Sequence, residues 1–283
     1  MKRQFTVLAL AAVLAWTNTS AIAQIKTTPS QSSPHLPVVV DPKILALLNS
    51  VQTNLKSVHS ISARANKVFT WSSTGPDTPS PIHQVVDIKL LRPNYASINI
   101  WNLELSSANR KWHRSKPEVI QIADGKYYWF WLASLNQYGK SAAGPSGSNI
   151  ELATIDYLGG FFTDKSPMVS EITRMNADHT LTAATLKDNQ FWNGANYKVV
   201  EISFGGSVTQ ALYIGDDRII HRITTTSRMA KDKHRMTVTE DDILDTFKLD
   251  PQLDKSIFKF ASPTGSTPID ETPPTTGHPE LKN

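Results

Sequence analysis

The feature that most constrains the fold is a period-two alternation of apolar and polar residues, which recurs in short runs along most of the chain. Val86, Ile88 and Leu90, for example, alternate with charged neighbours. Such alternation is typical of β-strands that bury one face. Tight turns separate several runs, at Asp124-Gly125 and at Asn193-Gly194. Because the connections are short, the pattern predicts an antiparallel meander, not an alternation of strands and helices.

Further runs of the same kind begin near Ala63, Ala96, Leu181, Val200, Leu212, Ile219 and Met236. Together the runs predict one long sheet. A sheet with this many strands tends to curl, and one of its faces must be covered. Helices are the candidates for that cover.

Residues 41–58 follow a helical period instead. Asp41 is a favourable N-cap, and Pro42 suits the first helical position. Apolar residues then recur at steps of three and four, namely Ile44, Leu47, Leu48, Val51, Leu55 and Val58. This stripe predicts an amphipathic helix that packs on the sheet. A second helix is expected over residues 149–162, and residues 166–175 fit either a helix or a strand.

Both ends of the chain differ from its centre. Lys2 and Arg3 precede an apolar run too short to cross a bilayer, and Ala21-Ile22-Ala23 fits a small-x-small cleavage site. We therefore expect residues 1–23 to be a cleavable signal peptide and the mature protein to be soluble and periplasmic. Residues 24–40 and 262–283 are rich in Pro, Ser and Thr, so we expect a disordered linker and a disordered tail around a folded domain at 41–261.

Composition excludes several functions. The chain has 29 Lys and Arg, 25 Asp and Glu, and no Cys. Removal of Lys2 and Arg3 leaves a net charge of about +2, which gives no electrostatic basis for nucleic-acid binding. Without Cys there is no disulfide, no thiolate metal site and no lipidated cysteine.

No motif for covalent chemistry stands out. The eight histidines show no metal-ligand spacing, and no serine lies in a nucleophile elbow. Glu240, Asp241 and Asp242 lack the pattern of a calcium loop and are expected to form a solvated turn. We therefore expect no catalytic residue, no metal, no cofactor and no enzymatic activity.

The segment Tyr127–Leu132 is apolar on both sides. In a strand, Tyr127, Trp129 and Trp131 point one way, and the alternate residues point the other way. An antiparallel strand with one wet face is not built like this. The second apolar face indicates a double-sided core, a partner or a ligand, and the sequence does not choose among them.

Three motifs occur in a suggestive order: DIKLLRPN at 87–94, IQIADGKYYW at 120–129 and FKFASPTG at 258–265. With the helix that begins at Asp41, they resemble the LolA/LolB/LppX-like superfamily of periplasmic lipoprotein and lipid carriers, especially its secreted members. The resemblance spans about residues 41–270. It implies an α+β fold, a strongly curved antiparallel β-sheet that forms an unclosed half-barrel, with helices as a lid on the concave face.

The resemblance also implies a function. It indicates a monomeric carrier that does not span the membrane and that holds a lipid, or the acyl chain of a lipidated protein, in an apolar cavity without covalent chemistry. The alternative is an envelope sensory or protein-interaction domain with no bound lipid. A secreted hydrolase that uses scattered carboxylates is a third hypothesis, which no motif supports.

The candidate lining residues come from the predicted lid helix and from the apolar faces of the strands. They are Ile44, Leu48, Val51, Leu55, Val86, Ile88, Leu90, Ile98, Ile100, Tyr127, Trp129 and Trp131. Periodicity does not decide which strand face is concave, so the opposite set of side chains remains an alternative lining.

Overall fold

The computed structural model describes residues 37–74, 78–107, 111–142, 167–231 and 234–269. These residues form one 12-stranded sheet with the strand order β12-β6-β5-β4-β3-β2-β1-β11-β10-β9-β8-β7. The strands are β1 (Ser60–Ser73), β2 (Ile82–Leu91), β3 (Tyr95–Leu105), β4 (Trp112–Asp124), β5 (Tyr127–Leu132), β6 (Gln137–Ala142), β7 (Leu181–Trp192), β8 (Ala195–Phe204), β9 (Val208–Ile214), β10 (Ile220–Lys231), β11 (His234–Leu249) and β12 (Thr267–Pro268). The described helices are α3 (Pro42–Lys56), α5 (Pro167–Ala177) and the short 3-10 helix η1 (Lys255–Phe258).

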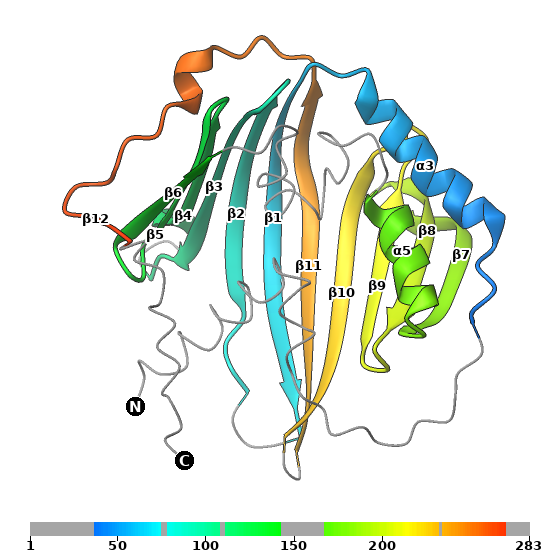
Figure 1. The fold of residues 1–283 in the computed structure, drawn as a ribbon. Helices are drawn as coiled ribbons and strands as arrows, with labels where there is room; N and C mark the ends of the chain where they lie inside the picture. Colours follow the sequence, from blue (N-terminus) through cyan, green and yellow to red (C-terminus); the bar gives the residue numbers. More distant parts are fainter. Residues whose placement is uncertain (1–36, 75–77, 108–110, 143–166, 232–233, 270–283) are drawn as a thin grey trace, which may run out of the picture.

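The chain starts the sheet at its centre and returns there. Strands β1 to β6 run in order toward one edge, and β7 to β11 run back from the other edge until β11 pairs with β1. Neighbouring strands are antiparallel, except that β12 runs parallel to β6. The sheet curves strongly without closing, and α3 and α5 lie on its concave side (Figure 1). The predicted half-barrel with helices on the concave face is confirmed.

Helix α3 forms as its sequence predicts. The Asp41 side chain accepts a hydrogen bond from the backbone N–H of Lys43 at 2.9 Å, and Pro42 opens the helix. At the other end, the Arg92 guanidinium donates to the carbonyl oxygens of Val58 and Leu55 at 2.8 and 3.1 Å. Arg92 thereby ties the C-terminal end of α3 to the end of β2.

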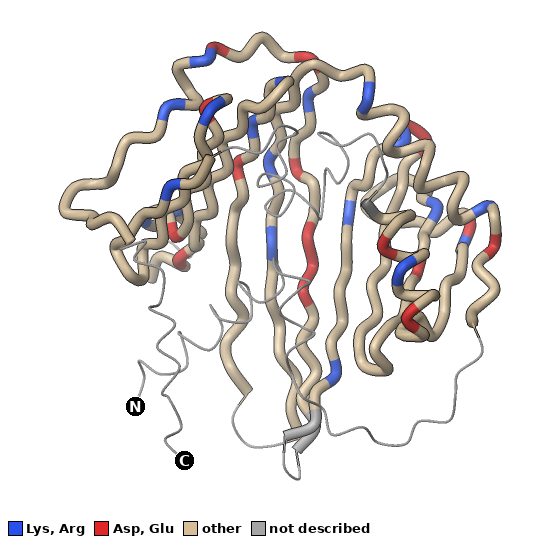
Figure 2. Tube along the Cα trace, viewed as in Figure 1, with Lys and Arg blue, Asp and Glu red and all other residues tan. Residues whose placement is uncertain are grey.

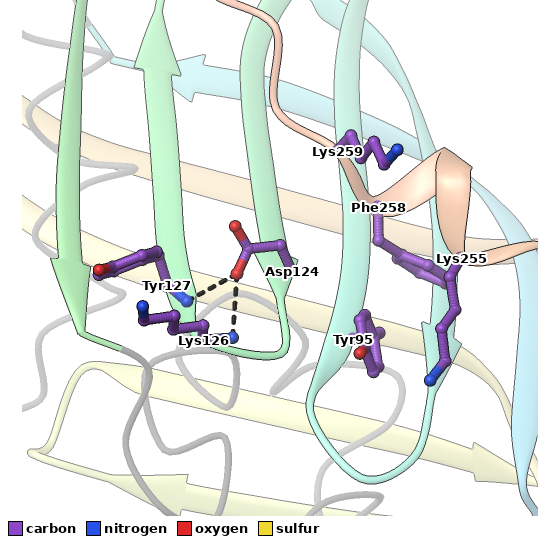
Figure 3. A pocket seen from close by; sticks show the side chains of 7 residues that line it. All are labelled: Tyr95, Asp124, Lys126, Tyr127, Lys255, Phe258 and Lys259. Carbon is purple, nitrogen blue, oxygen red and sulfur yellow. Dashed lines mark hydrogen bonds between the residues drawn. The ribbon is translucent and has the colours of Figure 1, made fainter.

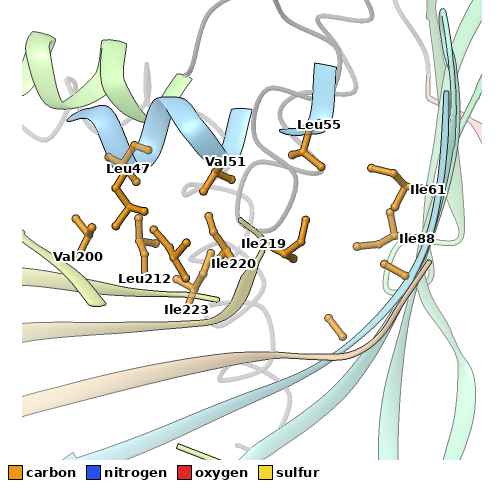
Figure 4. Packing of buried hydrophobic residues seen from close by; sticks show 14 of the residues in the cluster. Leu47, Val51, Leu55, Ile61, Ile88, Val200, Leu212, Ile219, Ile220 and Ile223 are labelled. Atoms are coloured by element: carbon orange, nitrogen blue, oxygen red, sulfur yellow. The ribbon is translucent and has the colours of Figure 1, made fainter. Parts of the chain in front are cut away.

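One hydrophobic core joins α3 to both halves of the sheet. Leu47, Val51 and Leu55 project from α3 toward the concave side chains of β8 to β10, while Ile61 and Ile88 continue the cluster onto β1 and β2 (Figure 4). Every one of these side chains is buried. The two runs of strands are therefore held together by packing on α3 as well as by the β1–β11 ladder.

Residues 167–177 form helix α5, which settles the choice between helix and strand for most of residues 166–175. Ile172 and Met175 of α5 pack into the core. Asn176 exchanges two hydrogen bonds with the backbone of Val38, at 2.9 and 3.0 Å, so the chain just before α3 is fixed to α5. The helix expected over residues 149–162 lies outside the described residues.

The expectation of a solvated turn at residues 240–242 is wrong. Glu240, Asp241 and Asp242 lie within β11, and Asp242 is only 1% exposed. Figure 2 shows acidic positions midway along this central strand. Lys67 forms ion pairs with Glu240 and Asp242 on one face, and Arg222 pairs with Asp241 on the other at 2.6 Å. Local composition favoured a turn because basic partners distant in sequence could not be seen.

The chain continues in ordered contact with the sheet after Ala261. The Asn136 side chain donates to the carbonyl of Gly265 at 2.8 Å, and Thr267–Pro268 pairs with β6. The segment from η1 to β12 therefore runs along the edge of the sheet.

Candidate functional site

Strand register decides which side chains share the concave face. Leu90 lies opposite Ala96, and Ala96 lies opposite Ala123. Ala123 in turn lies opposite Tyr128. Directly opposed residues of antiparallel strands point to the same side, so Tyr128 shares the concave face with Leu90. The residues on either side of Tyr128 in β5 point to the convex face.

The twelve candidate residues therefore fall into two groups. Nine lie on the concave side or project toward it from α3: Ile44, Leu48, Val51, Leu55, Val86, Ile88, Leu90, Ile98 and Ile100. Tyr127, Trp129 and Trp131 lie on the convex face and do not line the same surface. For β5 the alternative set applies, because Tyr128 and Phe130 take the concave positions of this strand.

The four candidates on α3 are closely packed. Ile44 and Leu48 are 0% exposed, and Val51 and Leu55 are 1% exposed. They share one cluster with Ile88, Leu90 and Ile98 of the sheet. Side chains thus fill the space between α3 and the sheet at these positions.

The concave face extends well beyond the two helices. Figure 1 shows α3 and α5 over the β7–β10 side of the concave face, whereas no described helix lies on the concave side of β2 to β6. On that side the concave face carries half-buried apolar residues, with Ile100 on β3, Val119 on β4 and Tyr128 and Phe130 on β5. Ile100 and Tyr128 also pack against the core, so this apolar surface continues from the core along the sheet.

A glycine shapes this surface. Phe130 lies opposite Gly139 of β6, and a Cβ atom on Gly139 would lie 2.3 Å from a ring carbon of Phe130. The ring therefore lies over the backbone of β6. Tyr128 stacks beside Phe130 with 6.3 Å between the ring centroids. The two rings form a flat aromatic surface at the concave end of the meander.

A row of polar side chains crosses the same face next to the apolar surface. Lys67 lies opposite Gln84, and Gln84 donates to Asn102 at 2.9 Å. Asn102 then donates to Glu118 at 3.2 Å. Together with Asp242 and Glu240 beside Lys67, these side chains form what we call the polar row. Its members come from β11, β1, β2, β3 and β4, one step along each strand from the apolar core.

Burial affects the chemistry of the polar row. Removal from water raises the pKa of Glu118 above the ordinary value of a glutamic acid. Gln121 lies opposite Phe130, and its Oε1 atom is buried and has no hydrogen-bond partner among the described residues. The concave face thus combines apolar surface with polar groups that can meet the polar end of an amphiphile.

The convex face of β5 is covered by the C-terminal segment. Phe260 stacks on Trp129 with 5.1 Å between the ring centroids and 8° between the planes. The ring of Tyr138 also contacts Phe260, at 5.6 Å, and Trp131 is only 7% exposed. The chain itself therefore covers the second apolar face of Tyr127–Leu132.

Other chemistry is sparse in the part of the chain that the structure describes. No group of three or more His, Asp or Glu residues there is arranged to hold a metal ion. His221 contacts the Asp217 carboxylate at 3.0 Å, beside the turn that joins β9 to β10. No helix among the described residues is long and apolar enough to cross a membrane.

Comparison with known proteins gives similarities of low sequence identity. No family model and no curated protein matches the sequence. Several solved structures are similar to the chain, and three of them are described here. The first is an uncharacterized conserved protein from Thermus thermophilus, with 11% identity, coverage of 80% of this chain and 98% of that chain, and a TM-score of 0.42.

The second is MucB in the MucA/MucB complex of Pseudomonas aeruginosa, with 8% identity, coverage of 76% of this chain and 60% of that chain, and a TM-score of 0.37. The third is a LolA superfamily protein from Nitrosomonas europaea, with 11% identity, coverage of 76% and 97%, and a TM-score of 0.28. The last belongs to the superfamily that the sequence motifs resemble.

Proposed function

We propose that the protein binds a hydrophobic ligand, a lipid or the acyl chain of a lipidated protein, on the concave face of β2 to β6. The observation that supports this is the apolar surface of Ile100, Val119, Tyr128 and Phe130, which has no described helix over it. Such a ligand is held by burial alone, at about 0.8 kcal/mol for each CH₂ group removed from water. Binding of this kind needs no catalytic residue, metal or cofactor.

The polar row fits the same proposal. A lipid has a polar end, and the row from Lys67 to Glu118 borders the apolar surface along the strands. In this arrangement the acyl chain contacts the apolar side chains, and the polar end of the ligand lies at the row. The nine concave candidates then belong to the packed core beside the binding surface or continue that surface along the sheet.

A matched pair of variants tests the proposal. Val119 and Ile120 are adjacent in β4, both half-buried, and on opposite faces of the sheet. A charge buried against an acyl chain is costly, so Val119→Glu should weaken binding of a fluorescent fatty acid strongly. Ile120→Glu should keep most of the affinity, provided that both variants unfold at similar temperatures. Equal affinity of the two variants would contradict the proposal.

A second pair of variants separates a loss of ligand affinity from a loss of stability. Phe130→Ala removes a ring from the concave surface, and Trp129→Ala removes a ring from the convex face of the same strand. The concave variant should lose more affinity for the fatty acid, even if the convex variant loses more stability. The reverse order of affinities would place the ligand on the convex face.

A second function is favoured by a different observation. The side chains of Leu48 and Val51 are fully packed beneath α3, as expected for a sensory or protein-interaction domain whose interior is filled. Such a domain would bind a protein partner and no lipid. Failure of both the wild type and the Ile120→Glu variant to bind the fatty acid would favour this function.

We also propose that the protein acts as a soluble monomer in the periplasm after removal of residues 1–23. The basis is the signal-like pattern at the N-terminus. Mass spectrometry of the protein from the envelope fraction tests this proposal, and a mass that starts at Gln24 supports it. An intact N-terminus in the cytoplasmic fraction would contradict it.

A further inference from the structure

A pocket of about 390 Å³ lies on the convex side of the sheet, away from α3 and from the proposed ligand surface. It forms between the turn that joins β4 to β5, the start of β3, and the η1 segment (Figure 3). Its walls are Tyr95, Asp124, Lys126, Tyr127, Lys255, Phe258 and Lys259. The pocket thus combines segments that are more than a hundred residues apart in the sequence.

The aromatic wall of the pocket is firmly held. Phe258 is 0% exposed, and its ring lies 5.6 Å from that of Tyr95. Gly125 adopts a φ of 90° at the β4–β5 turn, and a Cβ atom on it would lie 2.8 Å from the Tyr95 ring. The turn can approach Tyr95 only because this residue is glycine, which fixes the shape of the pocket.

The acidic groups near the pocket are already engaged. The Asp124 carboxylate accepts hydrogen bonds from the backbone N–H groups of Lys126 and Tyr127 at 2.9 and 2.7 Å, and from the indole N–H of Trp129 at 3.1 Å. Burial alone would raise the pKa of Asp124, but these donors outweigh it and lower the pKa. Asp254 accepts from the N–H of Ser256 at 2.7 Å. Among the described residues neither carboxylate forms an ion pair with a pocket lysine, although the pKa of Asp254 is lowered by its backbone hydrogen bond from Ser256 and also by the charge of Lys259.

The pocket lysines, in contrast, are arranged around the aromatic rings. The Lys255 ammonium lies 4.9 Å from the centroid of the Tyr95 ring, and the Lys126 ammonium lies 5.0 Å from that of Tyr127. Lys259 stands above Phe258 in Figure 3. Within the described part of the chain, none of the three lysines forms a salt bridge, so the pocket presents three positive charges beside rings that hold two of them in place.

We propose that this pocket binds a phosphate group, either free or as the head group of an anionic phospholipid. Three lysine side chains and one carboxylate, that of Asp124, line the pocket, so a phosphate bound there meets a net positive charge. The aromatic wall contacts the organic part to which the phosphate is attached. This site lies on the opposite face from the proposed hydrophobic-ligand surface and does not depend on that function.

A second basic pocket supplies a matched control. Lys43, Lys198 and Arg218 line a pocket of about 430 Å³ beside α3, together with Asp188. The triple variant Lys126→Gln, Lys255→Gln and Lys259→Gln removes the same net charge as the triple variant Lys43→Gln, Lys198→Gln and Arg218→Gln. A general effect of net charge should appear equally in both.

The test measures binding of inorganic phosphate by amide chemical shifts, and binding to vesicles of pure phosphatidylcholine or of phosphatidylcholine with phosphatidylglycerol by sedimentation. The proposal predicts that the first triple variant raises the Kd by roughly tenfold or more, while the control variant changes it by less than about threefold. If the first triple variant loses binding of inorganic phosphate, the ligand is identified as a free phosphate compound. Loss of binding to the anionic vesicles identifies a lipid head group.

Two results would overturn the proposal. One is an equal loss of binding in the two triple variants, which would show a dependence on net charge alone. The other is absence of both phosphate and anionic-vesicle binding in the wild type. Single variants at Lys126 and Lys259 extend the test should the triple variant unfold, because each removes only one charge at the surface.

Discussion

Two carboxylates of the sheet have pKa values that move in opposite directions. Burial alone would raise the pKa of Asp87, but its ion pairs with Arg64 at 2.7 Å and Arg114 at 2.6 Å outweigh burial and lower it. For Glu118, burial raises the pKa. The two residues should therefore make the free energy of unfolding depend on pH with opposite signs.

The sign of each effect follows from proton linkage. The folded pKa of Asp87 lies below its unfolded value of about 3.9, so Asp87 stabilises the fold above that pH and loses this contribution as the pH falls through the folded pKa. The folded pKa of Glu118 lies above its unfolded value of about 4.3. Stability is therefore lost as the pH rises from the unfolded pKa to the folded pKa of this residue.

Urea unfolding between pH 3 and pH 7 tests both residues in one series. Asp87→Asn should lose less stability than the wild type on acidification from pH 5 to pH 3. Glu118→Gln should gain stability relative to the wild type between pH 4 and pH 7. Parallel curves for the wild type and both variants would contradict the assigned pKa directions.

Gly139 provides a second prediction at the scale of single residues. Its Cβ atom in Gly139→Ala would meet the Phe130 ring at 2.3 Å, so the ring must move. We expect a loss of about 1–3 kcal/mol in the free energy of unfolding. Phe130→Leu in the same chain should recover part of that loss, since the smaller side chain relieves the contact. Additive losses in the double variant would show that the two residues do not interact.

At the scale of elements, the C-terminal segment acts as a cover for the convex face of the meander. Phe258 is 0% exposed next to Tyr95, so Phe258→Ala should cost about 3–5 kcal/mol in the free energy of unfolding. Gln252→Ala, at an exposed position of the same segment, is the control and should change stability by less than about 0.5 kcal/mol. Chemical denaturation measures both, and a small loss in Phe258→Ala would mean that the segment detaches without consequence.

Elements with local signals were predictable from the sequence. The cap at Asp41 with Pro42 gave the start of α3, and the Asp124-Gly125 turn gave the β4–β5 hairpin. The face of β5 was not predictable in this way, because the pairing of β3 with β4 shifts its register between Ile100 and Leu103, and no local pattern reveals such a shift. Only the pairing of Ala96 with Ala123 places Tyr128, and not Trp129, beside the concave core.

The polar row and the C-terminal cover escaped prediction for a related reason. Lys67 and Asp242 are far apart in the chain, and each looks like a surface residue when only its neighbours are considered. Phe260 likewise precedes a proline-rich region that shows no strand pattern, although it stacks on Trp129. Contacts between distant segments decide both features, and periodicity reports only local structure.

At the scale of the whole molecule, the topology leaves one concave half without a described helix. The two runs of strands, β1 to β6 and β7 to β11, meet at the β1–β11 pair, and α3 and α5 lie over the β7–β10 side. The other half presents Tyr128 and Phe130 beside the polar row. This asymmetry is the basis for a ligand surface next to a packed core.

Native mass spectrometry of the wild-type protein, purified gently from its own envelope, tests the proposed lipid binding most directly. The proposal predicts a stoichiometric acyl-chain ligand that remains bound in the native spectrum and leaves only on extraction with organic solvent. A bare protein mass, under conditions in which a known lipid carrier keeps its ligand, would contradict it.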